Sequence, residues 1–148
     1  MDDDPSVRGI LRKLIESVGM KAKVHASAQD FLDGYDPDRP GCLIVDVRLP
    51  GMSGLELQKI LVSRQASIPI IVITGHGSIP MAMEAMRWGA TDFLEKPIES
   101  QRLFNAIRRA LAKDSESRRR RALLRRTATA LASLTSNPTF AIRGCLKT

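Results

Sequence analysis

A short run of five residues, Cys42-Leu43-Ile44-Val45-Asp46, is the most informative indication of the fold of this chain. Its first four side chains are apolar without alternation, which is typical of a strand covered on both faces. The run ends in a carboxylate, and the chain turns soon afterwards through Leu49-Pro50-Gly51. In an open parallel α/β sheet, ligands bind just beyond the carboxyl ends of the strands. The run therefore predicts a buried strand, about 42–47, that carries Asp46 at the functional edge of a sheet.

Two further strand-like runs end in polar groups. Residues 70–73 are Ile-Ile-Val-Ile and lead into Thr74, and residues 91–95 lead into Lys96. The chain itself begins with Asp2-Asp3-Asp4. Carboxylates suit a hard cation such as Mg²⁺, and an ammonium suits phosphoryl oxygens. Together, these strand ends predict a site for a metal ion and a phosphoryl group.

Helices are expected between the strands. Apolar residues recur at helical spacing in several segments: 5–18, 27–34, 54–64, 78–88 and from 100 onward. The strand-like runs are 21–26, 42–47, 68–74 and 91–95. This alternation predicts an α/β fold with right-handed crossovers and a doubly wound parallel sheet. Nothing before Thr135 breaks the last pattern, so we expect a long C-terminal helix.

Composition and charge divide the chain unevenly. An apolar fraction of 43% over 148 residues allows one packed domain, and no segment approaches a membrane span. Residues 1–113 carry 15 Lys/Arg and 14 Asp/Glu, whereas residues 114–148 carry 8 against 2. We therefore expect a globular domain over 1–113, a basic helical linker over 114–135 and an unstructured tail over 136–148.

No secretory signal is visible, and Cys42 is expected to be a buried residue in a reducing cytoplasm.

Four motifs carry a resemblance to a known family. They are Asp-Asp-Asp before Pro5, Val-Asp-Val-Arg-Leu-Pro-Gly-Met-Ser-Gly (45–54), Ile-Thr-Gly-His-Gly (73–77) and Asp-Phe-Leu-Glu-Lys-Pro (92–97). In this order they resemble the receiver domain of bacterial two-component response regulators, in particular the FixJ-like group with LuxR-type DNA-binding outputs. The resemblance covers about residues 1–113 and implies a flavodoxin-like sheet with strand order 2-1-3-4-5.

The resemblance implies a role for each polar group at the strand ends. Asp46 would be the phosphoacceptor. Lys96 would pair with the phosphoryl oxygens, and the hydroxyl of Thr74 would bond another of them. Phe93 matches the family's aromatic switch residue, whose burial follows the movement of the threonine.

The resemblance also implies a Mg²⁺ site. Its ligands would be the carboxylates of Asp2, Asp3 and Asp46 and the backbone carbonyl of Arg48, with Asp2 acting through water. The side chains of Arg48 and His76 occupy positions that tune how fast the acyl phosphate hydrolyses.

The implied function is phosphorylation-dependent signalling. A sensor histidine kinase would donate the phosphoryl group, and a surface over residues 78–95 would form a homodimer that normally controls transcription. The chain would not be an enzyme beyond its own phosphotransfer and autodephosphorylation, and it would be cytoplasmic.

Other classes of function share some of these sequence features. Haloacid-dehalogenase-like phosphatases also use an aspartate at a strand end, but they need a second acid two residues later. Residue 48 is an arginine, which excludes this class of enzyme. The chain could instead be a degenerate or truncated receiver that acts by protein contact without phosphorylation. The arginines at 118–121 and 125–126 could bind nucleic acid electrostatically, although a solvated linker is the preferred interpretation.

Two departures from the family pattern affect these expectations. The family's first strand would end at Met1, so it is essentially missing, and so is the DNA-binding output domain. Because neighbouring strands lie about 4.8 Å apart, a gap of roughly 10 Å is expected between the strands at 21–26 and 42–47. The sheet must close up, stay split or borrow a strand. We therefore expect low stability and weak Mg²⁺ binding.

Overall fold

The computed structural model describes residues 5–49, 51–125, 139–143 and 145–146, with side chains over 8–49 and 51–124. Helices and strands alternate through the first two of these segments, as the hydrophobic pattern predicts. In chain order they are α1 (Pro5–Ser17), β1 (Lys21–His25), α2 (Ala28–Gly34), β2 (Leu43–Asp46), α3 (Gly54–Ser63), β3 (Ile70–Thr74), α4 (Ile79–Arg87), β4 (Asp92–Glu95) and α5 (Ser100–Arg125). Each predicted element is present, and its ends differ by one or two residues except at the end of the last helix. The predicted helical linker over 114–135 is described only as far as residue 125, and its remainder lies outside the described residues.

The sheet brings the strand ends of the sequence motifs to one edge. Strands β2, β3 and β4 are parallel neighbours, with Asp46 opposite Ile73 and Thr74 opposite Glu95. Their carboxyl ends therefore lie side by side at one edge. The full order is β4-β3-β2-β5-β1-β6, where β5 (Thr139–Arg143) and β6 (Cys145–Leu146) come from the end of the chain.

Strand β5 differs from the expectation of an unstructured tail. It runs parallel to β1 on one side and to β2 on the other, and Ala141 pairs with both Lys23 and Leu43. The sheet neither closes up nor stays split at the gap between β1 and β2, because β5 lies between them as a borrowed strand. The physical reason is that β1 and β2 would otherwise leave two rows of backbone hydrogen-bonding groups without partners. With β5 in this place, β1-β5-β2-β3-β4 reproduces the expected order 2-1-3-4-5.

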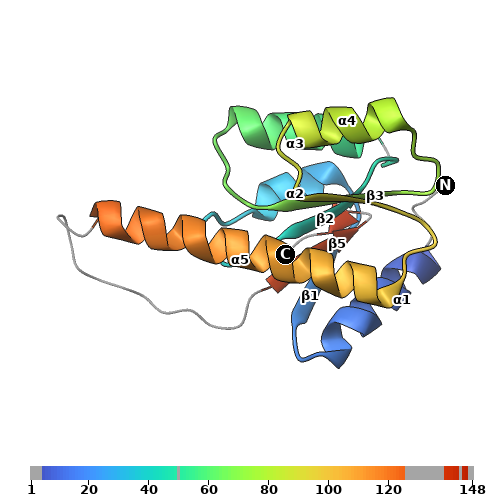
Figure 1. Ribbon diagram of the computed structural model, residues 1–148, viewed down its shortest axis with the longest axis horizontal. Coiled ribbons are helices and arrows are strands. Elements are labelled where there is room, and N and C mark those ends of the chain that lie inside the picture. Colours follow the sequence, from blue (N-terminus) through green and yellow to red (C-terminus); the bar gives the residue numbers. More distant parts are fainter. Residues whose placement is uncertain (1–4, 50, 126–138, 144, 147–148) are drawn as a thin grey trace.

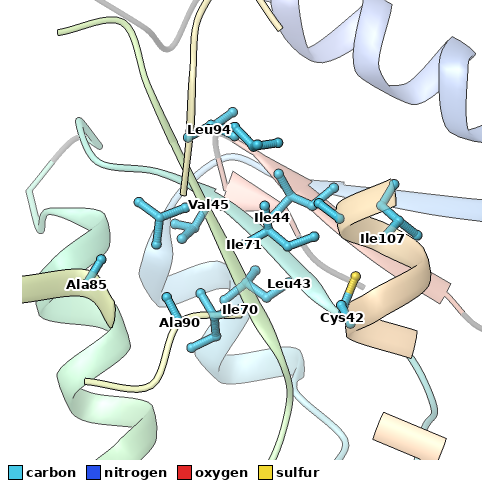
Figure 2. Packing of buried hydrophobic residues seen from close by; sticks show 14 of the residues in the cluster. Cys42, Leu43, Ile44, Val45, Ile70, Ile71, Ala85, Ala90, Leu94 and Ile107 are labelled. Carbon is cyan, nitrogen blue, oxygen red and sulfur yellow. The ribbon is translucent and has the colours of Figure 1, made fainter. Parts of the chain in front are cut away.

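Helices cover both faces of the sheet. In Figure 1, α3 and α4 lie on one face, and α1 and α5 lie on the other. Figure 2 shows Ala85 of α4 on one side of the β2–β3 pair and Ile107 of α5 on the opposite side. The residues from Cys42 to Val45 are all fully buried, which explains their unbroken apolar sequence. None of the helices that the structure describes has the length and apolar character needed to cross a membrane.

Helix α5 continues without a break through residue 113, the predicted end of the globular domain. It projects past the edge of the sheet (Figure 1). Two side chains just after residue 113 attach it to the loop before β2. Asp114 is 3% exposed and accepts a hydrogen bond of 3.1 Å from the N–H of Gly41. The guanidinium of Arg118 binds this carboxylate at 2.9 Å. It also donates to three loop carbonyls, those of Pro37, Asp38 and Arg39. The first turns of the basic segment are thus packed against the domain.

Candidate functional site

The site is built where β2, β3 and β4 end. Asp46 is the last residue of β2 and Thr74 the last of β3, and Lys96 follows the last residue of β4. The sheet ladder continues past the strand ends, because the N–H of Val47 donates to Ile73 at 3.0 Å and the N–H of Lys96 donates to the carbonyl of Thr74 at 2.8 Å. These backbone bonds fix the three chemical groups relative to one another.

Asp46 and Lys96 form a close ion pair. The Nζ of Lys96 lies 2.7 Å from Oδ2 of Asp46, and their side chains are 15% and 3% exposed. The other carboxylate oxygen, Oδ1, accepts a 2.9 Å hydrogen bond from the backbone N–H of Arg48. Charge-assisted hydrogen bonds of this kind hold a carboxylate firmly. The sequence-predicted nucleophile and cation are brought together, fifty residues apart along the chain.

Thr74 lies on the strand next to Asp46 and is 1% exposed. Its hydroxyl oxygen accepts a 3.2 Å hydrogen bond from the backbone N–H of His76. This bond ties the start of the β3–α4 loop to the end of the strand. The side chains of His76 and Arg48 are exposed; His76 belongs to the loop after β3, and Arg48 to the loop after β2.

Phe93 lies on β4, opposite Val72 of β3, and is half-buried. Its ring edge borders the β3–α4 loop: a Cβ atom added at Gly77 would lie 3.1 Å from Cε1 of Phe93 and 2.9 Å from Cγ2 of Thr74. The predicted switch residues therefore share one neighbour. The sequence did not single out Gly77, because a glycine in a polar loop carries no signal of what it touches.

The loop after Asp46 also depends on a glycine. Gly54 opens α3, and a Cβ atom there would lie 2.3 Å from the carbonyl oxygen of Asp46. The N–H of Gly54 donates to the carbonyl of Val47 at 2.8 Å. Ser53 caps the helix by accepting from the N–H of Glu56 at 3.1 Å. Helix α3 is thereby anchored directly on the backbone that carries the candidate nucleophile.

The implied Mg²⁺ site can be compared with the oxygen atoms present. Asp2 and Asp3 lie outside the described residues. Among the residues that the structure describes, no group of three His, Cys, Asp or Glu could hold a metal ion. The carboxylate of Asp46 and the backbone carbonyl of Arg48 are hard oxygen donors of the type that Mg²⁺ prefers. Their chemistry fits the ion, with the remaining ligands expected from Asp2, Asp3 and water.

Cys42 is a second nucleophilic side chain near the center of the fold. It is fully buried, and this burial raises the pKa of its thiol. Because the thiolate is the reactive form of cysteine, Cys42 is a packing residue, as expected from its place in the apolar run.

The surface of α4 carries exposed apolar side chains. Ile79, Met83 and Met86 are 77%, 57% and 50% exposed. Beside them, Nζ of Lys59 lies 5.5 Å from the ring centroid of Trp88. This surface lies within residues 78–95, for which the family resemblance implies a dimer surface.

Comparison with known proteins identifies the family. The family model of the response regulator receiver domain matches residues 1–108. The chain is 48% identical over 119 residues to the transcriptional regulatory protein FixJ of Azorhizobium caulinodans, which covers 80% of this chain and 56% of that protein. It is 46% identical over 118 residues to nodulation protein W of Bradyrhizobium diazoefficiens, covering 80% and 52% respectively. The chain thus spans about half the length of these relatives.

Solved structures agree with the sequence comparison. The response regulator StyR superimposes with a TM-score of 0.78 at 45% identity, over 84% of this chain and 63% of StyR. The structure described as FixJ-N superimposes with a TM-score of 0.69 at 45% identity, over 74% of this chain and 88% of that one. The strand-end motifs, the sheet order and these matches lead to one conclusion. The chain belongs to the response regulator receiver domain family of two-component systems.

Proposed function

We propose that this chain is a signalling receiver that accepts a phosphoryl group on Asp46 from a phosphohistidine of a sensor kinase. The proposal rests above all on the 2.7 Å contact between Lys96 and Asp46. This contact lies at the edge of the sheet where the carboxyl ends of β2, β3 and β4 meet. Phosphoryl transfer to a carboxylate needs a cation beside the nucleophile, and the structure holds the ammonium of Lys96 in contact with Asp46. This pair therefore favours a working phosphoacceptor over a protein that acts by contact alone.

The residues supply what the transfer needs. An oxygen of Asp46 forms a bond to phosphorus while the bond from phosphorus to the imidazole nitrogen breaks, and the departing imidazole takes up a proton from water. Lys96 then shares its ammonium with the phosphoryl oxygens, and Thr74 turns its hydroxyl toward them. The backbone N–H of Arg48 keeps the carboxylate oriented. Mg²⁺, when bound, neutralises negative charge on the transferring group.

The proposed output is a change in association. Phosphorylation adds charge and strong acceptors at the strand ends, and Thr74 and Phe93 connect that edge to the β3–α4 loop. The exposed apolar face of α4 would form a homodimer in the cytoplasm, and this association would control transcription. The family relatives named transcriptional regulators support this part of the proposal.

A second candidate function is nucleic-acid binding by the basic segment that contains the arginines at 118–121 and 125–126. Arg119 is exposed, but three other arginines whose side chains the structure describes have partners or buried atoms. Arg118 is bound to Asp114 and the 37–39 loop, and Arg120 pairs with Glu116 at 2.9 Å. The Nε and Nη2 atoms of Arg121 are buried. Because phosphate neutralisation needs several free cations, these contacts favour the linker interpretation.

The test is phosphorylation by a small donor. The purified chain is incubated with acetyl phosphate and Mg²⁺ and its intact mass is measured, with EDTA added to a parallel sample. We expect one phosphoryl adduct that EDTA prevents and that Asp46→Asn abolishes. The matched control is Asp38→Asn, which changes an exposed loop aspartate and should leave the adduct unchanged. An adduct that survives Asp46→Asn contradicts the proposal, and so does the absence of any adduct.

A further inference from the structure

The β3–α4 loop contains two glycines, Gly75 and Gly77, that differ in their surroundings. A Cβ atom at Gly75 would have its nearest neighbour, Cδ of Lys96, at 3.9 Å, which is an ordinary contact. A Cβ atom at Gly77 would lie 2.9 Å from Cγ2 of Thr74 and 3.1 Å from Cε1 of Phe93. Alanine therefore fits at residue 75, whereas at residue 77 both neighbours would have to move.

Glycine is needed at residue 77 because neighbouring atoms leave no room for a side chain, and not because of its backbone conformation. Neither loop glycine is among the positive-φ glycines of the described chain, so the backbone at residue 77 suits any residue type. A third neighbour, Oε2 of Glu95 at 3.4 Å, belongs to an exposed side chain that can yield. The contacts that decide are those with Thr74 and Phe93.

Thr74 is held at two points by this loop. Its hydroxyl accepts from the N–H of His76, and its methyl group lies against Gly77. Because a β-branched side chain has few allowed χ1 angles, displacing the methyl group also displaces the hydroxyl. The side chain is 1% exposed and cannot escape into solvent. The position of the hydroxyl thus depends on the space above Gly77.

We propose that Gly77 is a positioning residue that couples Thr74 to Phe93. Its missing side chain leaves one shared space, bordered by the threonine methyl on one side and the phenyl ring on the other. A movement of either side chain changes the room left for the other. This inference rests on the proposed phosphoacceptor function, because it assigns Gly77 a part in placing the hydroxyl that meets the phosphoryl group.

The experiment compares four variants with the unaltered chain: Gly77→Ala, Gly75→Ala, Thr74→Ser and the Gly77→Ala/Thr74→Ser double variant. The rate of phosphorylation by acetyl phosphate and the urea midpoint are measured for each. Overpacking of a well-packed site costs enough to shift an equilibrium by about fivefold or more. We expect Gly77→Ala to slow phosphorylation by about fivefold or more, and Gly75→Ala to stay within about twofold.

The double variant tests whether the contact between the new Cβ atom and the methyl group of Thr74 causes the effect of Gly77→Ala. Serine keeps the hydroxyl but lacks the methyl group that would meet the new Cβ atom. We expect it to restore phosphorylation to within about twofold of Thr74→Ser alone, and to recover the urea midpoint. Additive effects of the two substitutions, or equal effects of alanine at 75 and 77, would overturn the inference. If the unaltered chain takes up no phosphoryl group, the proposed function fails and the role of Gly77 in placing the hydroxyl fails with it. If the unaltered chain is phosphorylated and Gly77→Ala is phosphorylated equally fast, the inference alone is overturned.

Discussion

The ammonium of Lys96 and the carboxylate of Asp46 form the central contact of the site. Their burial determines how much the loss of one partner would change the free energy of unfolding. The two side chains are 15% and 3% exposed, with 2.7 Å between Nζ and Oδ2. Lys59 and Glu84 form a pair of similar length, 2.8 Å, but their side chains are 42% and 39% exposed. Ion pairs at the surface contribute little to stability, whereas removing one partner of a buried pair is costly.

Replacing Lys96 by methionine should therefore destabilise the protein by about 3 kcal/mol. The matched control, Lys59→Met, should cost less than about 1 kcal/mol. Adding Asp46→Asn to Lys96→Met removes the buried charge and should recover much of the loss. Urea denaturation of the single and double variants measures this coupling. Strictly additive free energies of unfolding would show that the pair contributes nothing to the fold.

Helix α3 is fixed at its first residue by a close approach between two backbones. A Cβ atom at Gly54 would meet the carbonyl oxygen of Asp46 at 2.3 Å and its carbonyl carbon at 2.9 Å. These atoms are backbone and cannot rotate away, in contrast to the side chains around Gly77. Helix α3 would have to shift as a whole.

Gly54→Ala should lower the free energy of unfolding by about 1–3 kcal/mol because of this overlap. The control is Gly9→Ala in the interior of α1, where a Cβ atom meets nothing within 4 Å. That substitution should stabilise the protein by about 0.5–1 kcal/mol, since alanine has the higher helix propensity. The two urea midpoints should thus move in opposite directions. Midpoints that move together would contradict the close approach at Gly54.

Helix α5 is attached to the loop before β2 by Asp114 and Arg118. The sequence presented Arg118 as part of a charge run, which is normally solvated. It could not reveal that loop carbonyls eighty residues earlier would face the guanidinium. The charge of a residue can be read from the sequence, but its partner depends on how the chain folds.

Arg118→Ala should cost about 2 kcal/mol in unfolding free energy, because it leaves a buried carboxylate and several carbonyls with fewer donors. It should also speed hydrogen exchange at the amide of Gly41, which donates to Asp114. Arg120→Ala serves as the control, since its side chain is 70% exposed, and it should change neither quantity. Unchanged exchange at Gly41 in Arg118→Ala would contradict the attachment.

At the scale of the whole molecule, the sheet is continuous because β5 lies between β1 and β2. A proline at residue 141 lacks the N–H needed for the ladder and is poorly tolerated in a central strand. Ala141→Pro should therefore abolish cooperative unfolding or lower its free energy by about 3 kcal/mol. Deleting only residues 147–148 is the control and should have no such effect. Unfolding is monitored by circular dichroism. An unchanged unfolding transition in Ala141→Pro would contradict the pairing of β5.

The sequence predicts much of this architecture because the relevant signals are local. Fully apolar runs identify β2 and β3, and the polar groups that end them locate Asp46 and Thr74 at one edge. The role of β5 could not be predicted in this way. A short segment with alternatives for pairing has no local signal that selects the space between two particular strands. The importance of Gly77 was hidden for a related reason, because its backbone conformation is ordinary and only its neighbours require glycine.

If Asp46 accepts the phosphoryl group, the modified residue can be mapped within the whole chain. The chain is phosphorylated with acetyl phosphate and Mg²⁺, the acyl phosphate is reduced with borohydride, and the resulting homoserine is located by tandem mass spectrometry. We expect position 46, and no other carboxylate, to be converted. Conversion elsewhere, or none under conditions that phosphorylate a known receiver in parallel, would contradict it.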